Sequence, residues 1–200
     1  MTRAPVSASA DGVATAAMIE PADTTLLADP LEFLQAEHYR QLAVLNLIDH
    51  LARARSSAAS RRRVAAAVLT FFRHDLAAHV EDEERDLFPL LRARHGATPE
   101  LAAILDQLRI EHEADERVVR PLLAMLRELA DRAGAAPSVS FRVAAAAFAL
   151  AQRRHLAWEN AVFVPMLRRL LSSRDLRQLA RAMAARRGVS LPRAVRKFAP

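Results

Sequence analysis

The chain repeats one polar arrangement inside two apolar helical patterns. His79 with Glu83, and His155 with Glu159, each place a histidine four positions before a glutamate, and a proline follows six positions after each glutamate. Residues four apart share one face of an α-helix and lie about 6 Å apart along its axis. Both pairs fall on apolar stripes with helical spacing, so the pattern places imidazoles and carboxylates inside a helical core.

The repeat extends to a second pair of helical segments. Glu37-His38 is matched by Glu111-His112, and these two histidines also lie on apolar stripes. The offset between the two dipeptides nearly equals the offset between the two His-x-x-x-Glu motifs. An internal repeat of this kind predicts a bundle with approximate twofold symmetry, in which each half supplies two histidines and one carboxylate.

The periodic segments predict an all-α fold, namely an up-down-up-down four-helix bundle with an additional short C-terminal helix. Asp29 before a proline, and Thr98 before a proline, are typical N-caps that start the first and third long helices. The expected helices span residues 30 to about 55, 61–95, 99–132, 138–171 and 174–187.

Three prolines and the apolar stripe of the fourth helix give two further predictions about the helices. Pro89, Pro121 and Pro165 fall inside long helices, where the missing N–H predicts kinks, two of them beside the polar residues. The stripe of the fourth helix is expected to comprise Phe148, Gln152, His155, Glu159, Val162 and Met166.

The two ends of the chain lack this periodicity. Residues 1–28 are rich in small and polar residues and predict a disordered N-terminal tail, residues 29–187 form the expected bundle, and residues 188–200 a C-terminal tail. We expect no membrane segment, because no apolar run is long enough. The N-terminus has no apolar signal core, and we therefore expect a cytoplasmic protein.

Composition narrows the chemistry that the chain can perform. The sequence has no cysteine, which excludes disulfides and thiolate ligands, and its hydrophobic content of 52% is enough for one substantial core. The formal charge is +6, with the excess arginines gathered towards the C-terminus. We interpret them as a solvated basic face and do not expect nucleic acid to be a partner.

Buried polar residues of this kind indicate a metal site. Two buried carboxylates without partners would cost roughly several kcal/mol each. A pair of cations removes that cost, and two histidines with one carboxylate are a known ligand set for non-haem iron, although imidazole and carboxylate also suit zinc and manganese. Glutamate can bridge two metals, so two such sets at the bundle centre predict a dinuclear site.

At these residues the sequence resembles the hemerythrin-like HHE cation-binding proteins. The resemblance covers about residues 29 to 187, through Ala-Glu-His38, His79 to Leu-Phe-Pro89, Glu-His112 and Arg-Arg-His155-Leu-Ala-Trp-Glu159. It implies two non-haem iron ions in a carboxylate-bridged centre that binds O2, NO or another small molecule. It further implies that the histidines are iron ligands and that Glu83 and Glu159 are bridging or terminal carboxylates; the histidines are His38, His79, His112 and His155.

One position departs from the oxygen-carrying members of that family. They have a second histidine four residues after the first on the third helix, where this chain has Glu116. We include Glu116 among the expected metal ligands, with a supporting role behind the ligands as the alternative. A carboxylate in that place moves the resemblance towards the carboxylate-rich di-iron proteins of stress response and iron-sulfur repair.

Three functions are compatible with the sequence. The first is binding or sensing of O2 or NO without turnover. The second is a di-iron enzyme in oxidative or nitrosative stress, which reduces peroxide or NO or delivers iron for iron-sulfur repair. The sequence does not separate this function from the first, and it does not identify a redox partner. The third is a helical interaction module whose basic C-terminus binds nucleic acid.

Overall fold

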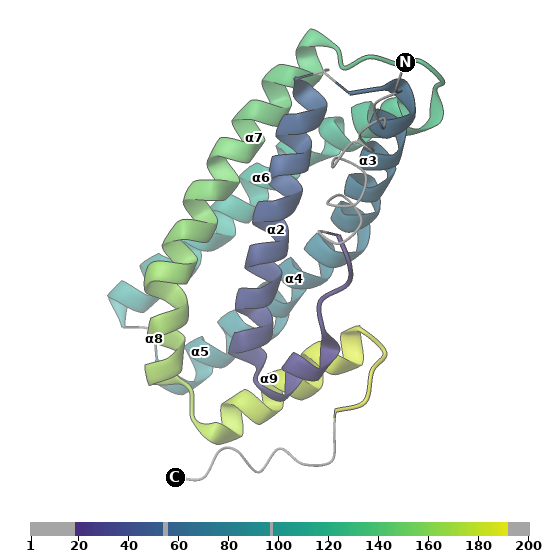
Figure 1. Cartoon of the computed structure of the whole chain (residues 1–200). Coiled ribbons are helices and arrows are strands. Elements are labelled where there is room, and N and C mark those ends of the chain that lie inside the picture. Colours follow the sequence, from purple (N-terminus) through teal and green to yellow (C-terminus); the bar gives the residue numbers. More distant parts are fainter. Residues whose placement is uncertain (1–18, 54–55, 97, 192–200) are drawn as a thin grey trace, which may run out of the picture.

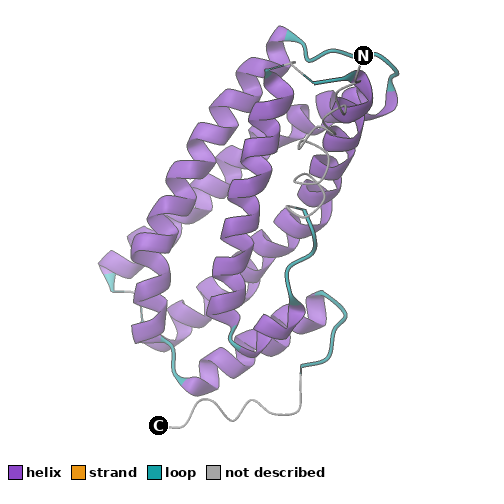
Figure 2. Cartoon of the chain, in the orientation of Figure 1, coloured by secondary structure: helices purple, strands orange, loops and turns teal. Residues whose placement is uncertain are grey.

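The structure is a computed structural model that describes residues 19–53, 56–96 and 98–191. Within these residues every regular element is a helix (Figure 2). Four long helical stretches lie side by side, and a shorter helix crosses one end of them (Figure 1). This confirms the predicted all-α bundle. None of the described helices is both long enough and apolar enough to cross a membrane.

The described residues form twelve helical elements, ten of which make up the four long stretches. A 3-10 turn, η1 (Thr24–Ala28), precedes α2 (Pro30–Ala52). The second stretch consists of α3 (Ala58–Phe71), η2 (Phe72–Leu76), α4 (Ala77–Glu81), η3 (Asp82–Leu87) and α5 (Phe88–His95). The third is α6 (Pro99–Asp131), the fourth is α7 (Val139–Trp158), η4 (Glu159–Phe163) and α8 (Val164–Leu170), and the crossing helix is α9 (Ser173–Arg186).

Helix starts follow side-chain caps. The carboxylate of Asp29 accepts hydrogen bonds from the backbone N–H groups of Leu31 and Glu32, at 3.1 and 3.2 Å. The second stretch starts at Ala58, three residues earlier than predicted, because the Ser57 hydroxyl accepts from the N–H of Ser60 at 3.2 Å. The segment between the first two predicted helices therefore supplies the N-cap of the second one.

The N-terminal region also differs from the expectation. The end of the predicted disordered tail forms η1, in which Leu27 is fully buried against Leu31 and Met183. Asp23 caps this turn by accepting from the N–H of Thr25. The apolar side chain of Leu27 is therefore packed in a segment too short to show helical periodicity in the sequence. Residues 1–18 and 192–200 of the predicted tails lie outside the described residues.

The core is divided by a polar layer. One apolar cluster fills the end of the bundle that contains Val44, Phe72, Leu126 and Phe148. A second fills the end covered by α9 and includes Leu31, Leu91, Leu105, Phe163 and Met183. On each of the four long stretches the predicted histidines fall between the residues of these two clusters, so the histidines form a layer across the middle of the bundle.

Two of the long stretches contain π-helical turns at this polar layer. η3 begins next to Glu83 and η4 begins at Glu159, and each ends shortly before a proline. The N–H of Phe88 bonds to the carbonyl of Glu83, and the N–H of Val164 bonds to that of Glu159, five residues back in both cases. A π turn is rare and is often found at functional sites.

The π turn in the fourth stretch changes which side chains face inward. Beyond Glu159 the buried residues of this stretch are Phe163, Val164 and Leu167, whereas Val162 is 43% exposed. The predicted positions Val162 and Met166 are therefore wrong by one residue. A π turn holds one more residue than an α turn, so every later side chain moves one position along the stripe.

Core burial yields a prediction for stability. Leu105 is fully buried in the α9-side cluster, whereas Leu150 on α7 is 63% exposed. Leu105→Ala should lower the free energy of unfolding by about 2–5 kcal/mol, since it leaves a cavity. Leu150→Ala should change it by less than about 0.5 kcal/mol. Urea denaturation followed by circular dichroism measures both, and equal effects would contradict the assigned core.

Candidate metal centre

Six of the seven predicted ligands converge in the polar layer. One group joins His38, His79, Glu83 and Glu159, and a second joins His112, His155 and Glu159. Within each group the potential ligand atoms all lie within 4.8 Å of one another. The residues come from all four long stretches, so only the folded bundle brings them together.

The Nε2 atoms of the histidines face the two glutamates. For Glu159 the distances are 3.3 Å to His38 and 3.4 Å to His155. For Glu83 they are 3.3 Å to His112 and 3.8 Å to His79. Two ligand atoms that share a metal, each about 2.0–2.2 Å from it, lie about 3.0–3.6 Å apart. Three of the four spacings fit a shared cation, and the fourth is slightly wider.

The polar atoms that face the centre lack hydrogen-bond partners among the described residues. Both carboxylate oxygens of Glu83, both of Glu159 and the Nε2 of His38 are buried in this condition. An unpaired buried carboxylate is costly, and native proteins seldom leave one unsatisfied. These side chains therefore do not satisfy one another by hydrogen bonds, and bound cations would satisfy them, which fits a metal centre.

The opposite nitrogen of each histidine is held by a second side chain. Nδ1 of His155 lies 2.8 Å from Glu111, and Nδ1 of His79 lies 3.4 Å from Glu37. The other two histidines are held by the residues that directly follow the two central glutamates. Glu84 lies 2.8 Å from His112, and Asn160 lies 2.9 Å from His38. An acceptor at Nδ1 fixes the proton there and directs the Nε2 lone pair to the centre.

Burial affects the two central carboxylates differently. Burial and the negative charge of Glu83 raise the pKa of Glu159 well above its usual range. Burial also acts to raise the pKa of Glu83, but His79 and His112 outweigh it and hold that pKa well below its usual range. Two carboxylates in one buried site resist ionising together. Cations placed between them would allow both to be charged.

The histidines are also unequal. Burial, together with the charge of His79, lowers the pKa of His38 to about 4, so this imidazole is neutral and suited to ligation. Burial acts in the same direction on His112, but contacts with Glu83 and Glu84 outweigh it and raise its pKa to about 9. The difference follows from the neighbours of the two rings: Glu83 and Glu84 both contact His112, whereas the Nδ1 partner of His38 is an amide and the charge of His79 opposes its protonation.

The structure does not bring Glu116 to the centre. Its side chain is 73% exposed and pairs with Arg120 at 3.3 Å. Position 116 is rotated about 40° past His112 around the helix axis, whereas position 115 is rotated about 60° in the other direction. The buried side chains farther along α6, such as Leu122 and Leu126, lie on the same side as Asp115, so Glu116 is turned to solvent.

Several supporting residues were not among the predicted site residues. Glu37 and Glu111 stand next to ligand histidines in the repeated Glu-His dipeptide, and that repetition was the signal available. Glu84 and Asn160 likewise follow the two central glutamates at equivalent positions. Glu84 bonds to His112 and Asn160 bonds to His38, so each lies on one half of the repeat and holds a histidine of the other half. Such pairing depends on how the helices pack, which sequence spacing alone does not show.

The family model of the hemerythrin HHE cation-binding domain matches residues 29–167. The chain belongs to this family. No curated protein and no solved structure matches it. The matched segment of this HHE protein runs from the cap of α2 into α8, so it contains the whole cluster and excludes α9. The resemblance inferred from the motifs is thereby confirmed, and the buried cluster is one that can hold metal.

The basic C-terminal residues of the HHE protein are partly used inside the molecule. Arg168 pairs with Glu32 at 2.6 Å, and Arg186 pairs with Glu81 at 3.1 Å and Asp86 at 2.7 Å. Arg187 is 14% exposed and also forms ion pairs. These arginines contribute to helix packing, which leaves fewer charges for the solvated face that the sequence predicted.

The geometry separates the glutamates by role. Glu159→Gln should abolish most metal binding, because it removes a charge placed between both groups of ligands, and Glu83→Gln should weaken it similarly. Glu116→Gln should retain the wild-type metal content, since that side chain is turned to solvent. Elemental analysis after anaerobic reconstitution measures this. Metal loss in Glu116→Gln equal to that in Glu159→Gln would refute the assigned cluster.

Proposed function

We propose that this HHE protein is a non-haem di-iron protein that binds or senses O2, NO or a related small molecule in the bundle core. The observation that carries the proposal is the unequal number of ligands in the two halves. Among the described residues, the His38/His79 half brings four side chains together, its own three and Glu159, whereas the other half brings together three, namely His112, His155 and Glu159. Two histidines with one carboxylate, and open positions, are typical of non-haem iron that reacts with small molecules.

The half with fewer ligands lies beside a groove. The groove has a volume of about 810 Å³ and runs between α6 and α7. Its wall includes the imidazole of His155, the carboxylates of Glu111 and Asp115, and the indole of Trp158. The rest of the lining is mainly alanine and aliphatic side chains, through which a small uncharged molecule can approach. The groove supports entry on the His112/His155 side.

The chain's own residues have separable tasks at this centre. His38, His79, Glu83 and Glu159 would hold one iron, and His112 and His155 would hold the other together with Glu159. Bound iron would supply electrons and an open coordination position. The apolar clusters on both sides exclude water from the layer, and the partners at Nδ1 keep the imidazoles oriented.

A di-iron enzyme is the second candidate, and the groove contains an observation in its favour. Asp115 accepts a hydrogen bond from Gln152, and burial raises the pKa of this carboxyl despite the nearby histidines His155 and His112. A carboxyl with a raised pKa takes up a proton more readily, and beside the half with fewer ligands it can pass that proton to a reacting molecule. Reduction of peroxide or NO consumes protons, so such a donor fits turnover.

Metal content and reactivity test the proposal together. Protein reconstituted anaerobically should contain two irons per chain, and its visible absorption should change when O2 or NO is added. Binding without turnover predicts a stoichiometric change that reverses when the gas is removed. Steady-state consumption of NO or peroxide would instead support the enzyme, and a chain that takes up no iron would refute the di-iron proposal.

Filling the groove should slow access without changing the metal. Ala151 lines the groove, whereas Ala157 on the same helix is exposed and lies outside the lining. Ala151→Trp should reduce the rate of NO binding by about tenfold, equivalent to about 1.4 kcal/mol in the barrier. Stopped-flow spectroscopy measures the rate, with Ala157→Trp as the matched control. Equal rates in the two iron-loaded variants would exclude this groove as the route.

A further inference from the structure

The end of α9 reaches the metal centre from outside the segment shared with the family. The helix is closed by Gly188, which has φ 64 and follows the C-cap residue Arg187. The N–H of Gly188 bonds to the carbonyl of Ala185 at 3.1 Å, and that of Val189 bonds to Ala184 at 3.0 Å. This pair of bonds is the Schellman arrangement, which fixes the end of the helix and so the starting point of the Arg187 side chain.

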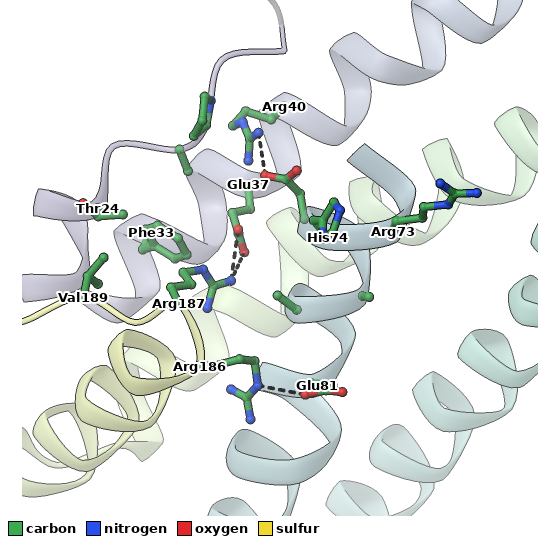
Figure 3. A pocket seen from close by; sticks show the side chains of 15 residues that line it. Thr24, Phe33, Glu37, Arg40, Arg73, His74, Glu81, Arg186, Arg187 and Val189 are labelled. Carbon is green, nitrogen blue, oxygen red and sulfur yellow. Dashed lines mark hydrogen bonds and ion pairs between the residues drawn. The ribbon is translucent and has the colours of Figure 1, made fainter. Parts of the chain in front are cut away.

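The Arg187 guanidinium contacts two carboxylates from different helices. It lies 3.1 and 3.2 Å from the two oxygens of Glu37 on α2, as Figure 3 shows, and 2.7 Å from Asp82 in η3. Its charged carbon lies 4.6 Å from the centre of the Phe33 ring, against which the guanidinium stacks. One nitrogen, Nη2, makes all of these carboxylate contacts, and the stacking on Phe33 holds the plane of the guanidinium.

Both carboxylates lie next to metal ligands, Glu37 through a side-chain contact and Asp82 along the backbone. Glu37 is the group that holds Nδ1 of His79, and it is only 3% exposed. Asp82 precedes Glu83 in the same π turn and is 1% exposed. Arg187 therefore compensates the charges of two buried carboxylates, one of which holds His79 while the other directly precedes Glu83 in the chain.

The other half of the bundle has no equivalent contact among the described residues. Glu111 holds His155 as Glu37 holds His79, but its side chain is 40% exposed and its second partner is the amide of Gln107, at 2.8 Å. The position equivalent to Asp82 is Trp158 in the repeat. The support by an arginine breaks the twofold symmetry of the centre.

We propose that Arg187 is a positioning residue of the metal centre, which holds Glu37 and Asp82 so that His79 and Glu83 are directed to the metal of the His38/His79 half. The proposal rests on the metal centre proposed above. It gives α9 a function in metal retention, and it makes the two halves unequal in affinity. Arg186 is the natural comparison, because it pairs with Asp82, Glu81 and Asp86 and does not contact Glu37.

Cobalt(II) titration of the metal-free full chain tests the proposal. Arg187→Gln should weaken one of the two cobalt sites by about 10–100-fold, as is typical when the partner of a ligand is lost, and leave the other site unchanged. Arg186→Gln removes a similar number of ion pairs between α9 and the bundle, including one to Asp82 but none to Glu37. It should therefore weaken that site less than Arg187→Gln does. Equal weakening in Arg186→Gln, or equal weakening of both sites in Arg187→Gln, would overturn the role of Arg187.

A double mutant separates positioning from loss of folding. Arg187→Gln alone leaves Glu37 buried without its cation, whereas the Glu37→Gln and Arg187→Gln double variant leaves no such charge. If Arg187 acts through Glu37, the double variant should bind cobalt as weakly as Glu37→Gln alone, and the two effects should not add. Additive effects would overturn the proposal. Wild-type protein that binds no cobalt would instead refute the metal centre itself.

Discussion

Two glutamate side chains, Glu83 and Glu159, are fully buried inside an apolar bundle, and the surrounding structure is organised around their charge. Four imidazoles face them, one from each long stretch, and no hydrogen bond within the described residues satisfies their oxygens. Charges in such a place are tolerated only with counter-charges nearby. The imidazoles of the polar layer reduce that electrostatic cost for Glu83, whose pKa they lower, whereas Glu159 depends on added cations to be charged as well.

Much of this arrangement was predictable from the sequence because it depends on local spacing. The His-x-x-x-Glu motif and its repeat place side chains on one helix face whatever the tertiary details are, so the bundle and the convergence of six polar residues follow. Helix starts at Asp29 and Thr98 were equally accessible, since a cap acts on the N–H groups two or three residues later. Ser57 shows the limit, because a serine-rich segment can be either a turn or a cap.

The remainder depends on long-range geometry. Glu116 satisfies the same four-residue spacing as the true members of the cluster, but the buried side of α6 shifts beyond His112, and only the packed partners determine that shift. Asn160 and Glu84 reach histidines on other stretches, and Arg187 reaches Glu37 across 150 residues of sequence. No periodicity in one helix contains that information.

The π turns have a consequence for sequence comparison. Each π turn adds one residue to the turn that contains a central glutamate. The inward-facing positions therefore follow a different register before and after that turn. A relative in which this stretch is continuous α-helix would align with the present chain only through a one-residue gap between the glutamate and the following proline. An alignment without a gap across Glu159 would then pair the exposed Val162 with a core residue of the relative. It would pair Phe163, which is fully buried here, with a residue outside that core.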